Sequence, residues 1–254
     1  MLFIIIVVPF YKLSIQEHSL EKMQGTWLLP IVPAIIMAAT GSIVSQVQEY
    51  ERAKFMVLLS YIIWGLGVLP SLCIIAFLYS KTAIYNLPPA EQLASIILPL
   101  GTLGQGSFAI VNLGIEANRL FSETGKEFVP VDMIGQIALA GGTLVGLVFW
   151  GFGLFWVVLS ASCVIYGIKK NDIKFNIGWW GITFPLGVFI SATNNFGNLL
   201  ENDGFKAFGS FLTVCIFIFW LLCMVNTIKG VCTTKLFNDP CFALPTVSKP
   251  ALKP

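Results

Sequence analysis

Charge is scarce in this 254-residue sequence, which has 15 Lys and Arg, 13 Asp and Glu, and one histidine. Charged residues make up 11% of the chain, against about a quarter in an ordinary soluble domain. Hydrophobic residues make up 56% of the chain, and the mean hydropathy is +0.83. The composition excludes a soluble globular domain and indicates a membrane protein.

The motifs of common enzymes and of metal sites are also missing. The sequence has no HExxH, no phosphate-binding loop, no G-x-S-x-G and no paired carboxylates inside its apolar runs. Its six cysteines have no CxxC or paired metal-ligand spacing. No basic stretch with interleaved aromatic residues suggests nucleic-acid binding. We therefore expect no enzyme activity, no metal, no cofactor and no nucleic-acid partner.

Six runs of 22 to 36 residues contain no Asp, Glu, Lys or Arg. A helix that spans a bilayer needs about 20 apolar residues. The chain is therefore predicted to be an all-α integral membrane protein with six full transmembrane helices. Their predicted ranges are residues 25–46, 55–80, 93–115, 133–168, 175–200 and 207–228.

The two ends of the chain do not fit this pattern. Residues 1–10, "MLFIIIVVPF", are too short to span a bilayer and lack the features of a signal peptide. We interpret them as the end of a partial transmembrane helix; a re-entrant or interfacial segment is the alternative. Residues 11–230 then form the transmembrane domain, and residues 231–254 a polar tail. The loops on one side of the predicted helices carry ten basic residues, and those on the other side carry five. Because cytoplasmic loops are enriched in basic residues, the tail and the 169–174 loop are expected in the cytoplasm.

Proline divides the six runs into two alternating kinds. The first, third and fifth runs each contain a proline followed by a branched apolar residue, and then small and polar residues. The second, fourth and sixth runs are richer in aromatic residues, and "VFWGFGLFWVVL" is hydrophobic all round, which suits a lipid-facing helix. The alternation predicts repeated hairpins, each with a proline-kinked inner helix and a smooth outer helix, around a pore.

A proline inside a helix lacks an N–H and clashes with the carbonyl four residues before it. In the fifth run, Pro185 is expected to leave the Gly181 carbonyl unpaired and to push Phe184 out of the helical region. Unpaired backbone groups persist in a membrane only against protein or a wet cavity. Phe184 could therefore close a pore as a gate; the alternative is that its ring only packs between helices.

The candidate site combines this gate with kinks and polar side chains. The predicted kinks that line the pore are Pro30, Pro33, Pro99 and Pro185. The candidate polar lining is Gln105, Ser107, Asn112 and Thr183, for which hydrogen bonds between helices are the alternative role. The predicted spans contain no Asp, Glu or His, so a proton relay is not expected. Helix dipoles could then attract an anion without charged side chains.

Three strings resemble the fungal sulfite efflux pumps: "HSLEKMQGTWLLPIVPAIIMAATGS", "LPPAEQLASIILPLGTLGQGSFAIVNLG" and "FNIGWWGITFPLGVFISATNN". This family is a branch of the tellurite-resistance and dicarboxylate transporter superfamily, with plant slow anion channels and malate transporters as relatives. Members of the sulfite branch usually read "PLGPLGQGGF", from which Thr102 and Ser107 depart.

The resemblance implies ten helices in five hairpins around a central pore, with an aromatic of the "WWxxTFP" motif, here Phe184, blocking it. The six predicted helices would be numbers five to ten, so the chain would be N-terminally truncated. Sulfite efflux through the plasma membrane is the implied function; a malate, dicarboxylate or other small-anion transporter and a non-functional truncated paralogue are alternatives. The implied partners are the lipid bilayer, sulfite, and either a homotrimer or a chain that supplies the missing helices.

Overall fold

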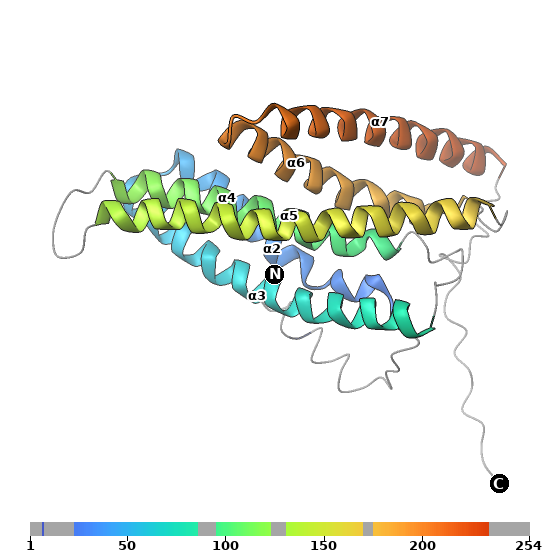
Figure 1. The fold of residues 1–254 in the computed structure, drawn as a ribbon, viewed down its shortest axis with the longest axis horizontal. Coiled ribbons are helices and arrows are strands. Elements are labelled where there is room, and N and C mark those ends of the chain that lie inside the picture. Colours follow the sequence, from blue (N-terminus) through green and yellow to red (C-terminus); the bar gives the residue numbers. More distant parts are fainter. Residues whose placement is uncertain (1–6, 8–22, 86–94, 123–130, 170–174, 234–254) are drawn as a thin grey trace, which may run out of the picture.

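The computed structural model describes residue 7 and residues 23–85, 95–122, 131–169 and 175–233 (Figure 1). Every regular element in these residues is helical. Apart from residue 7, the predicted partial helix at residues 1–10 lies outside the described residues, as does the predicted tail from residue 234 onward.

The described chain forms three helical hairpins. A short 3₁₀ turn, η2 (Gly25–Leu28), leads into α2 (Val32–Val44), and a second 3₁₀ turn, η3 (Ser45–Val47), precedes α3 (Tyr50–Tyr85). The second hairpin consists of α4 (Leu98–Ser122) and α5 (Val131–Lys169). The third begins with the 3₁₀ helix η5 (Ile177–Ile182), which leads into α6 (Thr183–Leu199) and then α7 (Asp203–Cys232).

Four of the described helices are long and apolar enough to cross a membrane: Tyr50–Ile84, Ser95–Phe121, Met133–Gly167 and Asp203–Cys232. The α-helical parts of α2 and α6 are shorter, with 13 and 17 residues, because each follows a 3₁₀ segment. The prediction of an all-α integral membrane protein is confirmed.

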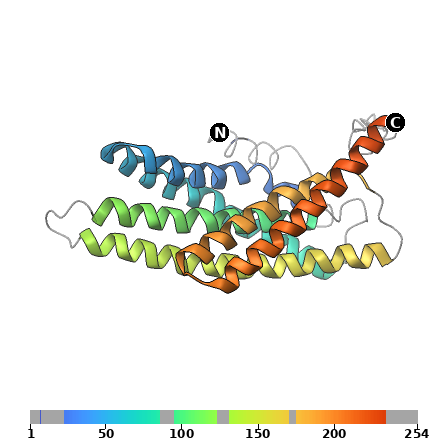
Figure 2. The same cartoon turned by 90° about the horizontal axis from the view of Figure 1, so that it is seen from above.

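Helix α4 lies at the centre of the described structure, where it packs against α2, α3, α5 and α6. In Figure 1 the α6–α7 hairpin lies above α5 and most of α3 lies below it, and in Figure 2 α6 and α7 cross in front of α4 and α5. The most apolar stretch of α4 is 78% buried, whereas the corresponding stretches of α3, α5 and α7 are 33%, 22% and 17% buried. The helix with Pro99 in its first turn is thus the inner one, and α5, α7 and α3, which contains Pro70 in its middle, are the outer ones.

Small residues let α4 and α5 approach closely. A Cβ atom on Gly142 would lie 2.7 Å from the backbone oxygen of Ile110, and one on Gly114 would lie 2.7 Å from that of Ala138. Side chains at these positions would force the helices apart. Glycine contacts of this kind are a main source of helix association in lipid, where apolar side chains gain little by leaving the bilayer.

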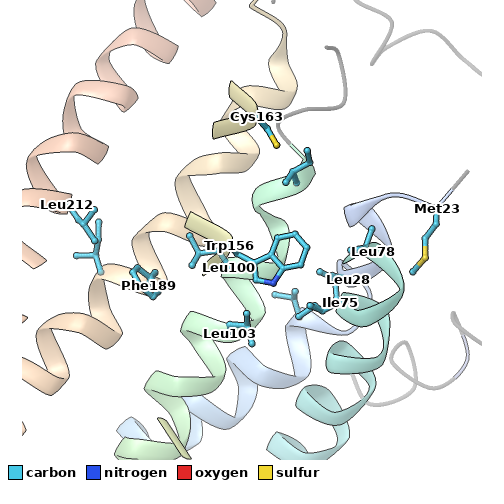
Figure 3. Packing of buried hydrophobic residues seen from close by; sticks show 13 residues of the cluster. Met23, Leu28, Ile75, Leu78, Leu100, Leu103, Trp156, Cys163, Phe189 and Leu212 are labelled. Atoms are coloured by element: carbon cyan, nitrogen blue, oxygen red, sulfur yellow. The ribbon is translucent and has the colours of Figure 1, made fainter. Parts of the chain in front are cut away.

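The main core cluster surrounds the first turns of α4 (Figure 3). Leu100 and Leu103 of α4 contact the buried rings of Trp156 from α5 and Phe189 from α6, and Leu28 and Ile75 extend the cluster toward α2 and α3. The cluster therefore joins all three hairpins. It fixes the starts of the inner helices relative to one another.

The inner-helix prolines lie in first turns. Pro33 is the second residue of α2, Pro99 the second of α4, and Pro185 the third of α6. The first N–H groups of a helix have no partner within it, so proline removes no hydrogen bond there. The kink takes the form of a change from 3₁₀ to α geometry just before each proline. The expectation that Phe184 leaves the helical region is wrong, because Phe184 is the second residue of α6.

Candidate functional site

The starts of the three inner helices meet at one end of the molecule. A Cβ on Gly25, in the turn before α2, would collide with the backbone of Ser95 and touch Leu98, at the start of α4. A Cβ on Gly101, one turn into α4, would lie 3.3 Å from Pro185 and 3.4 Å from the ring of Phe184. The structure thus brings Pro99, Pro185 and Phe184 to the same level, with the turn that carries Pro30 beside them.

Two of the inner helices, α2 and α6, each carry one face that their neighbours leave partly uncovered. On α6 these residues recur every three or four positions, which is the period of one helix face: Phe184, Gly187, Ser191, Asn194 and Asn198. On the segment that contains α2 they are Thr26, Leu29, Pro33, Ile36, Thr40, Ile43 and Val47. We call these the α6 face and the α2 face.

The two faces differ in composition from the exposed surfaces of the outer helices. Thr26, Thr40, Ser191, Asn194 and Asn198 are exposed on the inner helices, and none of them is charged. The exposed surface of α7 instead carries large apolar side chains: Phe211, Val214, Phe217, Ile218 and Leu222. Polar side chains within membrane helices usually face protein or a water-filled cavity. The contrast is clearest for the α6 face, because the α2 face also exposes Leu29, Ile43 and Val47.

Phe184 and Phe189 show how the two sides of α6 differ. Phe189 is fully buried and stacks on Trp150 with ring centroids 5.6 Å apart, against Gly104 of α4 and Gly153 of α5. Phe184 is 41% exposed, and its ring edge lies over Gly101. Phe189 is a core residue, whereas Phe184 leaves much of its ring uncovered beside α4.

The polar candidates occupy different surroundings. Gln105, buried on α4, lies one turn beyond Gly101, and Asn112 lies two turns further along, with its side chain donating to the Phe108 carbonyl. The Thr183 hydroxyl donates to the Trp180 carbonyl at the start of α6. The fully buried Ser107 hydroxyl donates to the Gly146 carbonyl on α5, 2.7 Å away. Ser107 thus joins two helices, and Gln105 and Asn112 follow the line of Gly101 along α4.

An ion pair at the far end of α4 has no counterpart among the sequence candidates. The carboxylate of Glu116 is buried and lies 2.9 Å from Arg119, which also donates to the Ser45 carbonyl at the end of α2. The positive charge of Arg119 is stabilised by the negative carbonyl ends of α2 and α4, near which it lies. The sequence signal was the three-residue spacing of opposite charges, which fits one helical turn. It was overlooked because the predicted helix ended at residue 115, whereas α4 continues to Ser122.

In the described residues, no group of three or more His, Cys, Asp or Glu side chains is placed to hold a metal ion. The arrangement defines a helical membrane protein whose three inner helices have a proline in their first turn and meet around α4. The chain belongs to the voltage-dependent anion channel family, whose pattern it matches over residues 1–228.

Among curated proteins, the chain is 34% identical to the sulfite efflux pump SSU1 of Arthroderma benhamiae over 232 residues, 91% of this chain and 60% of that protein. It is 34% identical, with the same coverage, to the sulfite efflux pump SSU1 of Trichophyton rubrum. An uncharacterized transporter of Methanocaldococcus jannaschii is 25% identical over 92% of this chain and 64% of its own length. No solved structure matches. The chain thus spans about 60% of the length of its fungal relatives.

Proposed function

We propose that this chain forms part of an anion pathway that exports sulfite across the plasma membrane, with its C-terminus in the cytoplasm. The observation that carries the proposal is the 34% identity, over 91% of the chain, to proteins named sulfite efflux pumps. A negative-inside potential favours the exit of an anion by about 2.3 kcal/mol per charge and 100 mV.

The charge distribution supports a small anion. In the described parts of α2, α4 and α6, the only basic side chain is Arg119, near the far end of α4, and the only acidic one is its partner Glu116. A dicarboxylate would need basic groups that match two separated charges, and the α2 and α6 faces have none. A compact anion can instead be held by hydroxyl and amide donors and by the positive ends of the inner helices.

Phe184 is the proposed gate, with Pro30, Pro33, Pro99 and Pro185 fixing the helix starts around it. Its ring is 41% exposed and lies over Gly101, so it can occupy space in front of α4 without being part of the core. Gln105, Asn112 and Thr183 are the proposed polar lining. We leave Ser107 out of this lining because its hydroxyl already donates to α5.

The pathway is proposed to be completed by further helices. The α2 face and the α6 face flank α4, and both carry exposed polar side chains, which in membrane helices usually face protein or water. The proposed partner is either a chain that supplies the part of the longer fungal relatives that this chain does not match, or other copies of this chain, a trimer among them.

The test is sulfite tolerance of a yeast strain that lacks its own exporter. The chain would be expressed alone and together with the N-terminal portion of the Arthroderma benhamiae relative, with surface expression checked in each case. Tolerance in either arm supports the proposal. Surface expression without tolerance in both arms contradicts it, and malate uptake measured in the same cells tests the dicarboxylate alternative.

Phe184→Ala tests the gate in whichever arm transports. Loss of the ring is expected to increase sulfite flux, because it removes the side chain proposed to close the path. Phe217→Ala is the matched control, since Phe217 is 59% exposed on the outer helix α7. Equal flux in wild type and in both variants would show that Phe184 does not limit transport.

A further inference from the structure

The middle of α4 is buried on all sides but one. Between Pro99 and Ala117 every residue of the helix is buried except Phe108, Asn112 and Ile115. These three positions are three or four residues apart, so they lie on one face of the helix. The described neighbours of α4 thus leave a single strip of its surface partly open, which we call the α4 strip.

The α4 strip lies on the side of the helix away from α5. Helix α5 contacts α4 through Ser107, whose hydroxyl donates to the Gly146 carbonyl, and through Gly114. Helix α6 packs on one flank of the strip, where Gly104 meets the backbone of Phe189. Further along the strip, Arg119 reaches the end of α2. The strip therefore opens between α6 and α2.

Gln105 lies at the edge of this strip, three residues before Phe108, and is 8% exposed. In the described residues no hydrogen bond joins its side-chain amide to another group. The amide is also not among the unpaired polar atoms that the protein seals off completely, in contrast to the indole nitrogen of Trp156. A polar side chain that is more than nine-tenths buried thus has an unpaired amide that can still be reached from the strip.

This amide lies one helical turn beyond the proposed gate. A Cβ on Gly101 would lie 3.4 Å from the ring of Phe184, and Gln105 follows four residues later, about 6 Å along the helix axis. An ion that passes the ring of Phe184 along α4 therefore meets the Gln105 amide next.

A glutamine amide has two N–H donors and a carbonyl oxygen that accepts. Chloride and the sulfite dianion carry no proton, so they can use only the N–H groups. Hydrogensulfite in its O–H form can use both, because its oxygens accept from the amide nitrogen and its O–H donates to the amide oxygen. The amide therefore favours an anion that is also a donor.

The surroundings of Gln105 favour one negative charge over two. The nearest basic side chain on α4 is that of Arg119, about four turns and 21 Å further along the axis. Helices α2 and α6, residues 55–80 of α3 and residues 133–168 of α5 contain no Asp, Glu, His, Lys or Arg. The cost of taking an ion out of water rises with the square of its charge, so it is roughly four times larger for a dianion.

We propose that Gln105 is the residue that selects the transported ion, and that it takes a singly charged oxyanion with one O–H group, hydrogensulfite rather than the sulfite dianion. The inference rests on the proposed function, to which it adds the binding residue and the ionic form of the substrate. Selection by a neutral amide also leaves the ion weakly enough held to move on, as conduction requires.

The first test measures sulfite uptake into inside-out plasma-membrane vesicles from the yeast arm that transports. Gln105→Leu keeps a side chain of similar size without donors or acceptor, and it is expected to raise the half-saturating sulfite concentration about tenfold or more. Gln136→Leu, at an exposed position on α5, is the matched control and should behave as wild type. A lower maximal rate with an unchanged half-saturating concentration would show that Gln105 only supports the fold, and would overturn the proposal.

The second test raises the pH of the same vesicles through the second ionisation of sulfurous acid at constant total sulfite. Uptake is expected to fall as hydrogensulfite is depleted. The helix segments around Gln105 carry no acid, histidine or base, so the profile reports the form of the substrate. Uptake that stays constant or increases over this range would show that the dianion is carried and would overturn the proposal.

A binding measurement separates this inference from the proposed function. In the purified full chain with ¹⁵N-labelled glutamine in lipid nanodiscs, Gln105→Leu identifies the amide signal of Gln105. Hydrogensulfite is expected to shift this signal more than chloride does, and the Gln136 signal should stay in place. An unmoved Gln105 signal overturns the inference, even where wild-type vesicles transport and the proposed function stands. A shifted signal without transport in either arm supports binding at Gln105 and contradicts the proposed function.

Discussion

Helices α4 and α7 have similar lengths but opposite surroundings. The apolar stretch of α7 has the higher mean hydropathy, 2.5 against 1.5 for α4, yet only 17% of it is buried, against 78% for α4. In a soluble protein the more apolar helix would be the buried one. Lipid reverses this order, because apolar side chains lose nothing by facing it, whereas glycine, proline and polar groups find their contacts inside.

The largest expected effect contrasts an inner phenylalanine with an outer one. Phe189→Ala removes a fully buried ring that stacks on Trp150, and such truncations cost about 3–5 kcal/mol. Phe217→Ala removes a ring that is 59% exposed on α7, and the change should stay within about 0.5 kcal/mol. The free energy of unfolding, measured by steric trapping in bicelles, compares the two. Equal losses would contradict the distinction between inner and outer helices.

Two adjacent glycines of α5 give the next largest contrast. A Cβ on Gly142 would lie 2.7 Å from the backbone oxygen of Ile110, whereas one on Gly141 would meet nothing within 4 Å. Gly142→Ala should therefore destabilise the chain by about 1–3 kcal/mol, the usual cost of overpacking. Gly141→Ala should be neutral or stabilising by up to about 1 kcal/mol, because alanine favours the helix. The same unfolding measurement tests both, and similar losses at the two positions would contradict close packing of α4 and α5.

Much of this inner and outer arrangement could be predicted from the sequence. Pro33, Pro99 and Pro185 mark the starts of the three inner helices, although the outer helix α3 also contains a proline, Pro70, in its middle. Whether a proline lies within a helix or in its first turn depends on where α geometry begins. The 3₁₀ segments before α2, α4 and α6 set that point. Because α6 begins at Thr183, Phe184 lies inside the helix, and the expectation that Pro185 pushes it out is wrong.

The contacts of some buried or partly buried side chains could not be predicted, for a different reason. Trp156 lies in a run that is hydrophobic all round, so periodicity gives no sign of which residues face inward, yet Trp156 is 1% exposed. Lys81 and Glu116 lie just beyond two of the charge-free runs, yet Lys81 lines a cavity and Glu116 forms a buried ion pair. Charge spacing locates the helix ends but does not show what these charges contact.

The smallest expected contrast compares two Trp–Thr hydrogen bonds of equal length. Trp150 donates to the hydroxyl of Thr193, which is fully buried on α6, and Trp180 donates to that of Thr227, near the end of α7; both distances are 2.9 Å. Hydrogen bonds between membrane helices average about 0.6 kcal/mol and reach about 1.7 kcal/mol. Thr193→Val should approach the upper value, because the isosteric valine leaves the indole N–H with no substitute in the protein interior. Thr227→Val should stay at or below the average, since water and lipid headgroups near the helix end can accept the freed N–H. A loss for Thr227→Val as large as that for Thr193→Val, measured by steric trapping, would show that the bond within the third hairpin stabilises the chain as much as the buried bond between α5 and α6.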